Sequence, residues 1–126
     1  MCSDFPVEVS LPEQVGSSGA VTFDIHCPPG GGDVYLPIMQ RTSLGENAHP
    51  EYYPMRHSLP LEVNTPLSYT VDTDDDVSGS SICVYVIEPT RSQYDDILGS
   101  LDASDQLLSI PDSIQRVSAQ ECTRRQ

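Results

Sequence analysis

Apolar and polar residues alternate over residues 5–11 and again over residues 20–27. This period of two is typical of strands with one buried face. Residues 81–87 (SICVYVI) form a nearly continuous apolar run, which suits a strand at the centre of a sheet. Two shorter strands are expected at 59–63 and 67–71. The pattern predicts a mainly β domain.

Prolines and glycines mark the breaks between these strands. The run 28–32 (PPGGG) predicts a loop, because two of its residues lack a donor and three lack a side chain. Residues 33–40 are apolar enough for a strand, but Pro37 within them indicates an edge position or a bulge. Residues 41–60 are polar and proline-rich, and predict a long loop of the kind that often carries function. Residues 72–80 are expected to form an exposed turn.

The period changes in the last third of the chain. Apolar side chains recur at helical spacing within residues 93–108, which predicts a short helix. Pro111 suits a first helical turn, so a second short helix is expected over 112–121. The predicted fold is an antiparallel β-sandwich that forms a single domain over residues 1–126, with residues 90–126 as a helical C-terminal extension packed on it.

Composition and charge exclude several classes of partner. The chain has 126 residues, enough for one core, and that core must come from Val, Ile, Leu and a few Tyr because Trp is absent. The formal net charge of −13 repels a phosphate backbone, so we expect no nucleic-acid partner. Because no apolar stretch approaches the roughly 18 residues of a membrane span, we expect no membrane insertion.

All six basic residues are arginine, and lysine is absent. Three explanations fit this bias: a GC-rich genome, adaptation to high salt, or selection against lysine modification. The sequence alone does not choose among them.

The four cysteines predict disulfide bonds. None of them forms a CxxC pair, whereas an even number in a small, weakly hydrophobic domain suits two bridges. We favour Cys27 with Cys83, which would tie two strands across the core, and Cys2 with Cys122, which would join the chain ends. Disulfides imply an oxidising, extracellular or cell-surface location. The alternative is an intracellular protein with four free thiols.

Two cysteines lie on predicted strands about 55 residues apart, and an Asp-rich turn and Gly79 precede the second. This arrangement resembles the B and F strand framework of immunoglobulin-like sandwiches. The resemblance is carried by Cys27 and Cys83 and covers about 90 residues. It implies an immunoglobulin-like form of the sandwich. The core Trp of that family is missing, and Ser81 stands where its corner Tyr is expected.

The acidic run 72–76 suggests a weak calcium site, with Asp72, Asp74 and Asp76 as the candidate ligands. It is not an EF-hand loop, because Val77 occupies the position that requires glycine. A solvated acidic turn explains the same residues.

Other patterns indicate no reaction and no cofactor. His26, His49 and His57 lack the spacing of a zinc site and are interpreted as surface histidines. Residues 28–33 resemble a phosphate-binding loop in composition only, since no lysine and no helix pattern follow. No G-x-S-x-G motif is present.

The segment 51–57 contains residue types that are enriched in protein interfaces. Its candidate partner-binding residues are Tyr52, Tyr53, Met55 and Arg56. Alternatively, one of the tyrosines fills the edge of the core.

These observations predict a secreted or surface-exposed, non-enzymatic domain that recognises another protein through the 41–60 loop. Alternatives are a viral structural or host-directed effector protein, and a loop-presenting protein similar to protease inhibitors. An enzyme is a further rival, and it would need a concave site with convergent polar groups.

Overall fold

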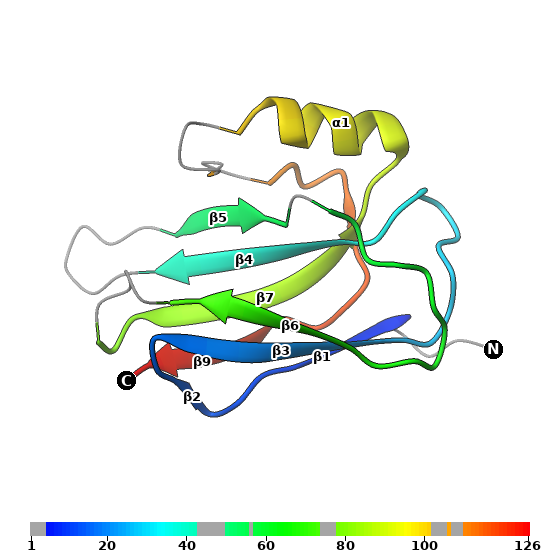
Figure 1. The fold of residues 1–126 in the computed structure, drawn as a ribbon. Helices are drawn as coiled ribbons and strands as arrows, with labels where there is room; N and C mark the ends of the chain where they lie inside the picture. Colours follow the sequence, from blue (N-terminus) through cyan, green and yellow to red (C-terminus); the bar gives the residue numbers. More distant parts are fainter. Residues whose placement is uncertain (1–4, 43–49, 56, 74–77, 102–105, 107–109) are drawn as a thin grey trace.

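Two β-sheets and one helix make up the part of the chain that the computed structural model describes (Figure 1). The described residues are 5–42, 50–55, 57–73, 78–101, 106 and 110–126. In chain order the elements are β1 (Val7–Ser10), β2 (Gln14–Val15), β3 (Ser18–Ile25), β4 (Leu36–Thr42), β5 (Glu51–Pro54), β6 (Leu67–Asp72), β7 (Ser81–Glu88), α1 (Arg91–Gly99), β8 (Gln115–Arg116) and β9 (Glu121–Arg125). The predicted mainly β class is confirmed.

The strand order is that of a sandwich. One sheet has the order β1-β3-β6 and the other β2-β9-β7-β4-β5, with β8 also paired to β7. The pairs are antiparallel except for β2 with β9. Among the described residues, no strand pairs with β6 on the side away from β3.

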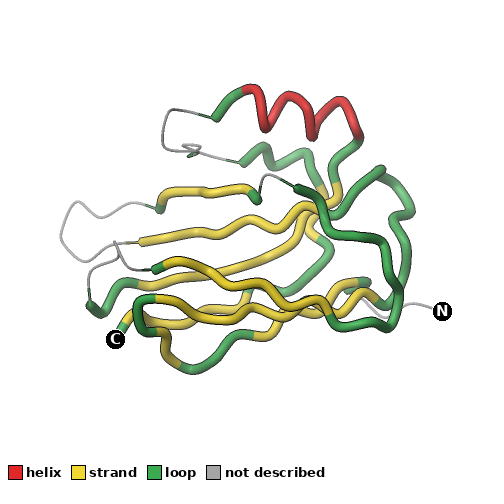
Figure 2. The backbone as a smooth tube through the Cα atoms, viewed as in Figure 1, coloured by secondary structure: helices red, strands yellow, loops and turns green. Residues whose placement is uncertain are grey.

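The core between the sheets follows from the period-two pattern. Val7 and Val9 of β1 and Phe23 of β3 pack with Val84 and Val86 of β7, and all five are buried. Their polar neighbours in sequence point away from the core, as alternation along a strand requires. Figure 2 shows long loops crossing between the layers at the right-hand end of the view.

The second face of the larger sheet is covered by α1. Tyr85 and Ile87 of β7 pack there with Ile38 of β4, Ile97 of α1 and Ile114. β7 is therefore buried on both faces, which explains its nearly unbroken apolar run and confirms its predicted central place. Each of its two sets of side chains belongs to a different core.

α1 begins earlier and ends earlier than predicted. Thr90 is its N-cap and forms a capping box with Gln93, in which each side chain accepts a hydrogen bond from the other's backbone N–H. The helix ends at Gly99, where the Ser100 N–H donates to the Ile97 carbonyl. The Thr-x-x-Gln spacing was a usable sequence signal for this start.

The second helix expected over 112–121 is wrong. Residues 115–116 form β8 and residues 121–125 form β9, which lies between β2 and β7. Residues 90–126 are therefore not a helical extension, because their last part completes the larger sheet. Between the two strands Val117 bonds to the Val86 carbonyl, and the Ser118 hydroxyl accepts the Val86 N–H. These two hydrogen bonds pair the Val86 N–H and carbonyl at the edge of β7, at a point where the chain bulges between two strands. Residues in a helix could not pair with β7 in this way.

Two strand predictions also need correction. The segment 59–63 forms only an isolated bridge between Val63 and Ile25. β4 is an interior strand despite Pro37, whose expected place was an edge or a bulge. Pro37 is the second residue of β4, and its carbonyl accepts the Met55 N–H just beyond the end of β5. The side of Pro37 that lacks an N–H therefore faces the end of β5, where no further strand hydrogen bond is needed.

The favoured disulfide pairing is wrong. Cys83 of β7 is bonded to Cys122 of β9, directly opposite in the antiparallel register, with a Cα–Cα distance of 4.0 Å. Cys27 follows β3 in the other sheet and is also disulfide-bonded, whereas Cys2 lies outside the described residues. The sheet register brings Cys83 to Cys122, so the bridge joins neighbouring strands and does not cross the core.

Two buried tyrosines predict a stability loss at high pH. Burial raises the pKa of Tyr35 to about 12, and the nearby Glu88 charge adds to this effect. Burial likewise raises the pKa of Tyr85 to about 12, partly opposed by the Arg116 charge. Since the unfolded phenols ionise near pH 10, their contribution to stability is full below pH 10 and is lost as pH rises toward 12. We expect two tyrosines to resist ionisation at pH 11 in an absorbance titration at 295 nm, and denaturation midpoints to fall above pH 10. Ordinary ionisation of all six tyrosines near pH 10 would contradict this burial.

Candidate binding site

The predicted contact residues do not form one patch. β5 pairs with β4 from Glu51 to Pro54, so the expected 41–60 loop contains an edge strand. Alternation along β5 then sends Tyr52 toward α1 and Tyr53 toward the side between the sheets, where Met55 also packs. All three side chains are half-buried. Arg56 lies outside the described residues. The prolines that flank β5 hid this strand from the sequence analysis.

An apolar pocket lies between β6 and the β4–β5 pair, on the side of the sandwich that we call its open side. It has a volume of about 130 Å³. Half-buried apolar side chains from both sheets surround it, so it opens to solvent above the core. Its lining consists of Val21, Phe23, Pro37, Ile38, Met39, Met55, Tyr69, Thr70, Val71, Asp72 and Val84. We call this pocket, together with the neighbouring Arg41 and Tyr53, the open-side cleft.

Arg41 holds one end of the open-side cleft together. Its guanidinium donates to the Asp72 carbonyl at 2.7 Å, which links β4 of one sheet to the end of β6 in the other. The guanidinium carbon lies 4.9 Å from the centre of the Tyr53 ring, within cation–π range. The Tyr53 hydroxyl donates to the Glu51 carboxylate at 2.7 Å. These two contacts hold the aromatic ring of Tyr53 in place.

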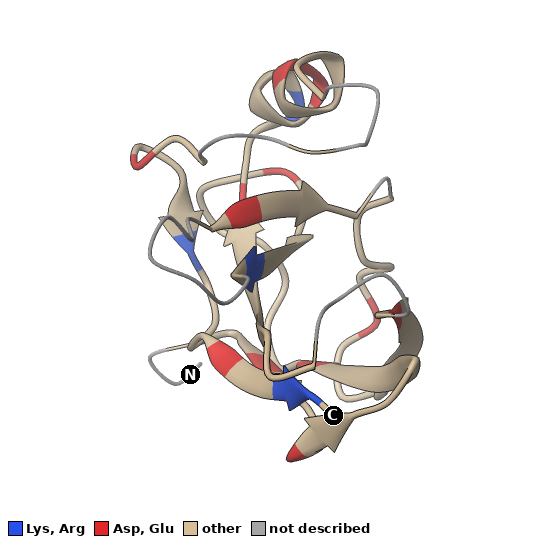
Figure 3. Cartoon of the chain, turned by 90° about the vertical axis from the view of Figure 1, so that its left-hand side faces the viewer, with Lys and Arg blue, Asp and Glu red and all other residues tan. Residues whose placement is uncertain are grey.

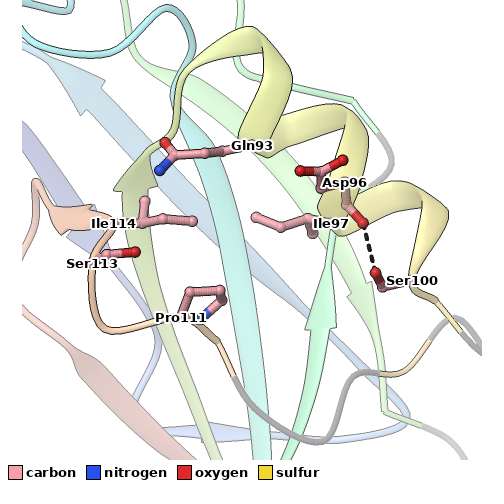
Figure 4. Close-up of a pocket in the computed structure, with 7 residues that line it drawn as sticks. All are labelled: Gln93, Asp96, Ile97, Ser100, Pro111, Ser113 and Ile114. Atoms are coloured by element: carbon pink, nitrogen blue, oxygen red, sulfur yellow. Dashed lines mark hydrogen bonds between the residues drawn. The ribbon is translucent and has the colours of Figure 1, made fainter.

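A second pocket, of about 230 Å³, lies between α1 and the segment that leads to β8 (Figure 4). Ile97 and Ile114 point toward each other across it, and Pro111 lies below them. Its polar residues are Gln93, Asp96, Ser100 and Ser113. The Ser100 hydroxyl donates to the Asp96 backbone carbonyl at 2.7 Å, and the lining includes no histidine or cysteine. We assign no reaction to this pocket.

The glycine-rich loop does hold an anion, but the anion is a side chain of the same protein. Gly30, Gly31 and Gly32 donate their N–H groups to the Glu88 carboxylate at 3.0, 3.2 and 3.1 Å. Glu88 is 8% exposed, so these donors are its main partners. Consecutive N–H groups of this kind form an anion-binding nest. The nest is occupied by Glu88 and holds the loop on the end of β7.

The structure describes only one of the three candidate calcium ligands. Asp72 is exposed at the end of β6, while Asp74 and Asp76 lie outside the described residues, so the calcium site stays a prediction. Within the described part of the chain, no three His, Cys, Asp or Glu residues are placed to hold a metal ion. The His26 imidazole lies 3.4 Å from the exposed Glu8 carboxylate. Figure 3 shows acidic residues spread over the helix and the strands, with basic residues at fewer positions.

Comparison with protein family models, curated proteins and solved structures gave no significant match for this chain. No helix within the described residues is both long and apolar enough to cross a membrane. The candidate site therefore depends on the geometry of this chain alone.

Proposed function

We propose that this protein is a non-enzymatic binding domain of an oxidising, extracellular or cell-surface compartment, and that it recognises another protein at the open-side cleft. The Cys83–Cys122 bond supports the compartment, because disulfides persist where thiols are not kept reduced. The sequence predicted that the whole 41–60 segment forms the contact surface. In this proposal, only the residues of that segment that border the cleft, Tyr53 and Met55, contact the partner.

One observation carries this proposal: the cleft gathers side chains of the types that dominate protein interfaces. These half-buried side chains come from both sheets: Met39 and Arg41 from β4, Tyr53 from β5, Tyr69 from β6, and Met55 from the residue that follows β5. Tyr, Met and Arg are enriched in interface cores, where a few anchors of this kind supply most of the binding energy. Held by the sandwich, these side chains would lose little conformational freedom on binding.

The proposal is tested by selecting binders from a displayed library of random twelve-residue peptides, with the wild-type domain as bait. Clones are then measured against Tyr69→Ala and Met55→Ala, with Leu61→Ser as the control. Leu61 is 48% exposed and lies outside the cleft, so its replacement removes exposed apolar surface without touching the proposed site.

We expect the dominant clones to lose at least tenfold in affinity with either cleft variant and to keep their affinity for Leu61→Ser. Truncating an anchor residue commonly costs about 2 kcal/mol or more, and a factor of ten corresponds to about 1.4 kcal/mol. Thermal unfolding of each variant identifies losses that come from misfolding. Clones that bind both folded cleft variants as tightly as the wild type would refute the proposed surface.

A further inference from the structure

The geometry points to a particular binding mode at the open-side cleft: we infer that the partner binds there as an extended, positively charged segment that adds a strand to the edge of β6 that faces away from β3. This inference rests on the proposed function. It takes its support from three observations, which are the direction of the β6 backbone groups, the apolar pocket beside them and the charge of the chain.

The pairing register shows which β6 groups point outward. In an antiparallel pair, residues alternate between those that bond the partner strand and those that face away from it. The Thr73 N–H donates to the Ser17 carbonyl at 3.0 Å, so odd-numbered residues of β6 bond β3. Ser68, Thr70 and Asp72 therefore direct their N–H and C=O groups away from β3. The bond from Arg41 to the Asp72 carbonyl agrees with this direction.

β6 is the best strand edge for addition among the described strands. It has six residues and no proline, and among the described strands it pairs only with β3. Of its outward groups, the Asp72 carbonyl at its end already accepts from Arg41. The edge strand β5 has four residues and ends in Pro54, which has no N–H to donate. At β1, the Val7 N–H already donates to the Val117 carbonyl. An open edge of this length is a template for another strand.

The pocket supplies side-chain recognition for such a strand. Tyr69 of β6 faces the core side, where Met39 and Met55 also line the pocket. The neighbouring Ser68 and Thr70 are exposed, and Thr70 borders the pocket. A strand added beside β6 would lie about 4.8 Å from it and would turn alternate side chains the same way. Apolar residues at every second position would then enter the pocket, and the residues between them would face solvent.

The negative charge of this chain indicates which residue types the partner carries at its solvent-facing positions. The chain carries a net charge of −13, and Asp72 is exposed at the end of the β6 edge. A segment with lysine or arginine at the outward positions would be attracted to this surface, and its association would be faster at low salt. A second copy of the chain would bring another −13 to the contact and is disfavoured. The expected occupant therefore alternates basic and apolar residues.

The probe for this mode is an eight-residue peptide that alternates lysine with valine, measured by calorimetry against the wild-type domain. Two further versions carry N-methyl groups on alternate peptide bonds, one version on the lysine amides and one on the valine amides. Only one of these sets can face β6, so we expect one methylated peptide to lose at least tenfold in affinity while the other binds like the parent. Each methylated peptide serves as the control for the other.

A protein variant checks the same contact from the other side. Thr70→Pro removes an N–H that faces away from β3, so it should weaken the parent peptide at least tenfold while thermal unfolding reports an intact fold. A peptide with glutamate in place of lysine should not bind, and binding of the lysine peptide should weaken as salt rises from 50 to 200 mM.

The outcomes separate this mode from the proposed function. Displayed clones that depend on Tyr69 and Met55 but ignore Thr70→Pro, together with equal affinity for both methylated peptides, would overturn strand addition and leave the binding surface standing. Preference for the glutamate peptide would overturn the basic partner. Self-association of the wild type that Thr70→Pro abolishes would replace that partner with a second copy.

Discussion

Replacing Glu88 with alanine is expected to lower the free energy of unfolding by about 3 kcal/mol. The carboxylate accepts hydrogen bonds from three consecutive glycine N–H groups and is almost fully buried. Each buried donor that loses its partner costs about 1 to 3 kcal/mol, and we take the lower end because Gly30 and Gly31 are exposed to water. Urea denaturation measures the loss. Glu88→Gln, which keeps one acceptor oxygen, should lose less.

Two controls limit the explanations for this loss. Glu62→Ala removes an exposed carboxylate and should change stability by less than about 0.5 kcal/mol. Gly32→Ala tests the same loop through its packing, because an added Cβ would lie 2.5 Å from the Glu88 carbonyl oxygen and 2.8 Å from that of Pro89. We expect it to cost about 2 kcal/mol. Gly30→Ala has nothing within 4 Å and should be nearly neutral. Equal stability of the wild type and Glu88→Ala would show that the nest does not hold the loop.

Removing the bond between Cys83 and Cys122 by the double change to alanine is expected to cost about 4 kcal/mol. The bond closes a loop with a sequence separation of 39, and that loop contains α1 and β8. Opening it gives the unfolded chain more conformations, which favours unfolding. Urea denaturation under non-reducing conditions measures the difference. Glu121→Ala, an exposed change on the same strand, is the control and should remain within about 0.5 kcal/mol of the wild type.

Peptide mapping without reductant identifies the bond directly. The cross-linked peptides should join Cys83 to Cys122, as the β7–β9 register requires. A peptide that joins Cys27 to Cys83 would contradict this register and restore the arrangement across the core that the sequence spacing favoured. Four free thiols in the native protein would also contradict the proposed extracellular compartment.

Alternating apolar residues were enough to predict β1, β3 and β6, and the continuous apolar run was enough to predict β7 and its burial on both faces. β9 gave no such signal. Only Thr123 is buried among its five residues, and that residue is polar. The strand forms because the edge of β7 needs hydrogen-bond partners that residues far along the chain supply. The helix predicted over residues 112–121 was inferred from local spacing, which contains no information about the hydrogen-bonding needs of β7.

The candidate site depended even more on tertiary structure. The sequence analysis identified Tyr53 and Met55 by residue type, but grouped them with Tyr52, which the strand sends to the opposite face. It could not find Tyr69 as their neighbour, because β6 belongs to the other sheet, nor Arg41, because the pairing of β4 with β5 was not predicted. The carboxylate that fills the glycine loop was hidden for the same reason, since Glu88 lies 56 residues beyond Gly32.

By itself, the sequence determined the class of fold, the main strands and turns, and a strongly acidic surface. Each of these depends on residues within a few positions of one another, or on simple counts. The tertiary structure alone decided the place of Pro37 in an interior strand, the pairing of Cys83 with Cys122 and the place of β6 as the last of the described strands in the smaller sheet. These features depend on which strands become neighbours, and that choice is made by the burial and hydrogen bonding of the whole chain, beyond what any local pattern records.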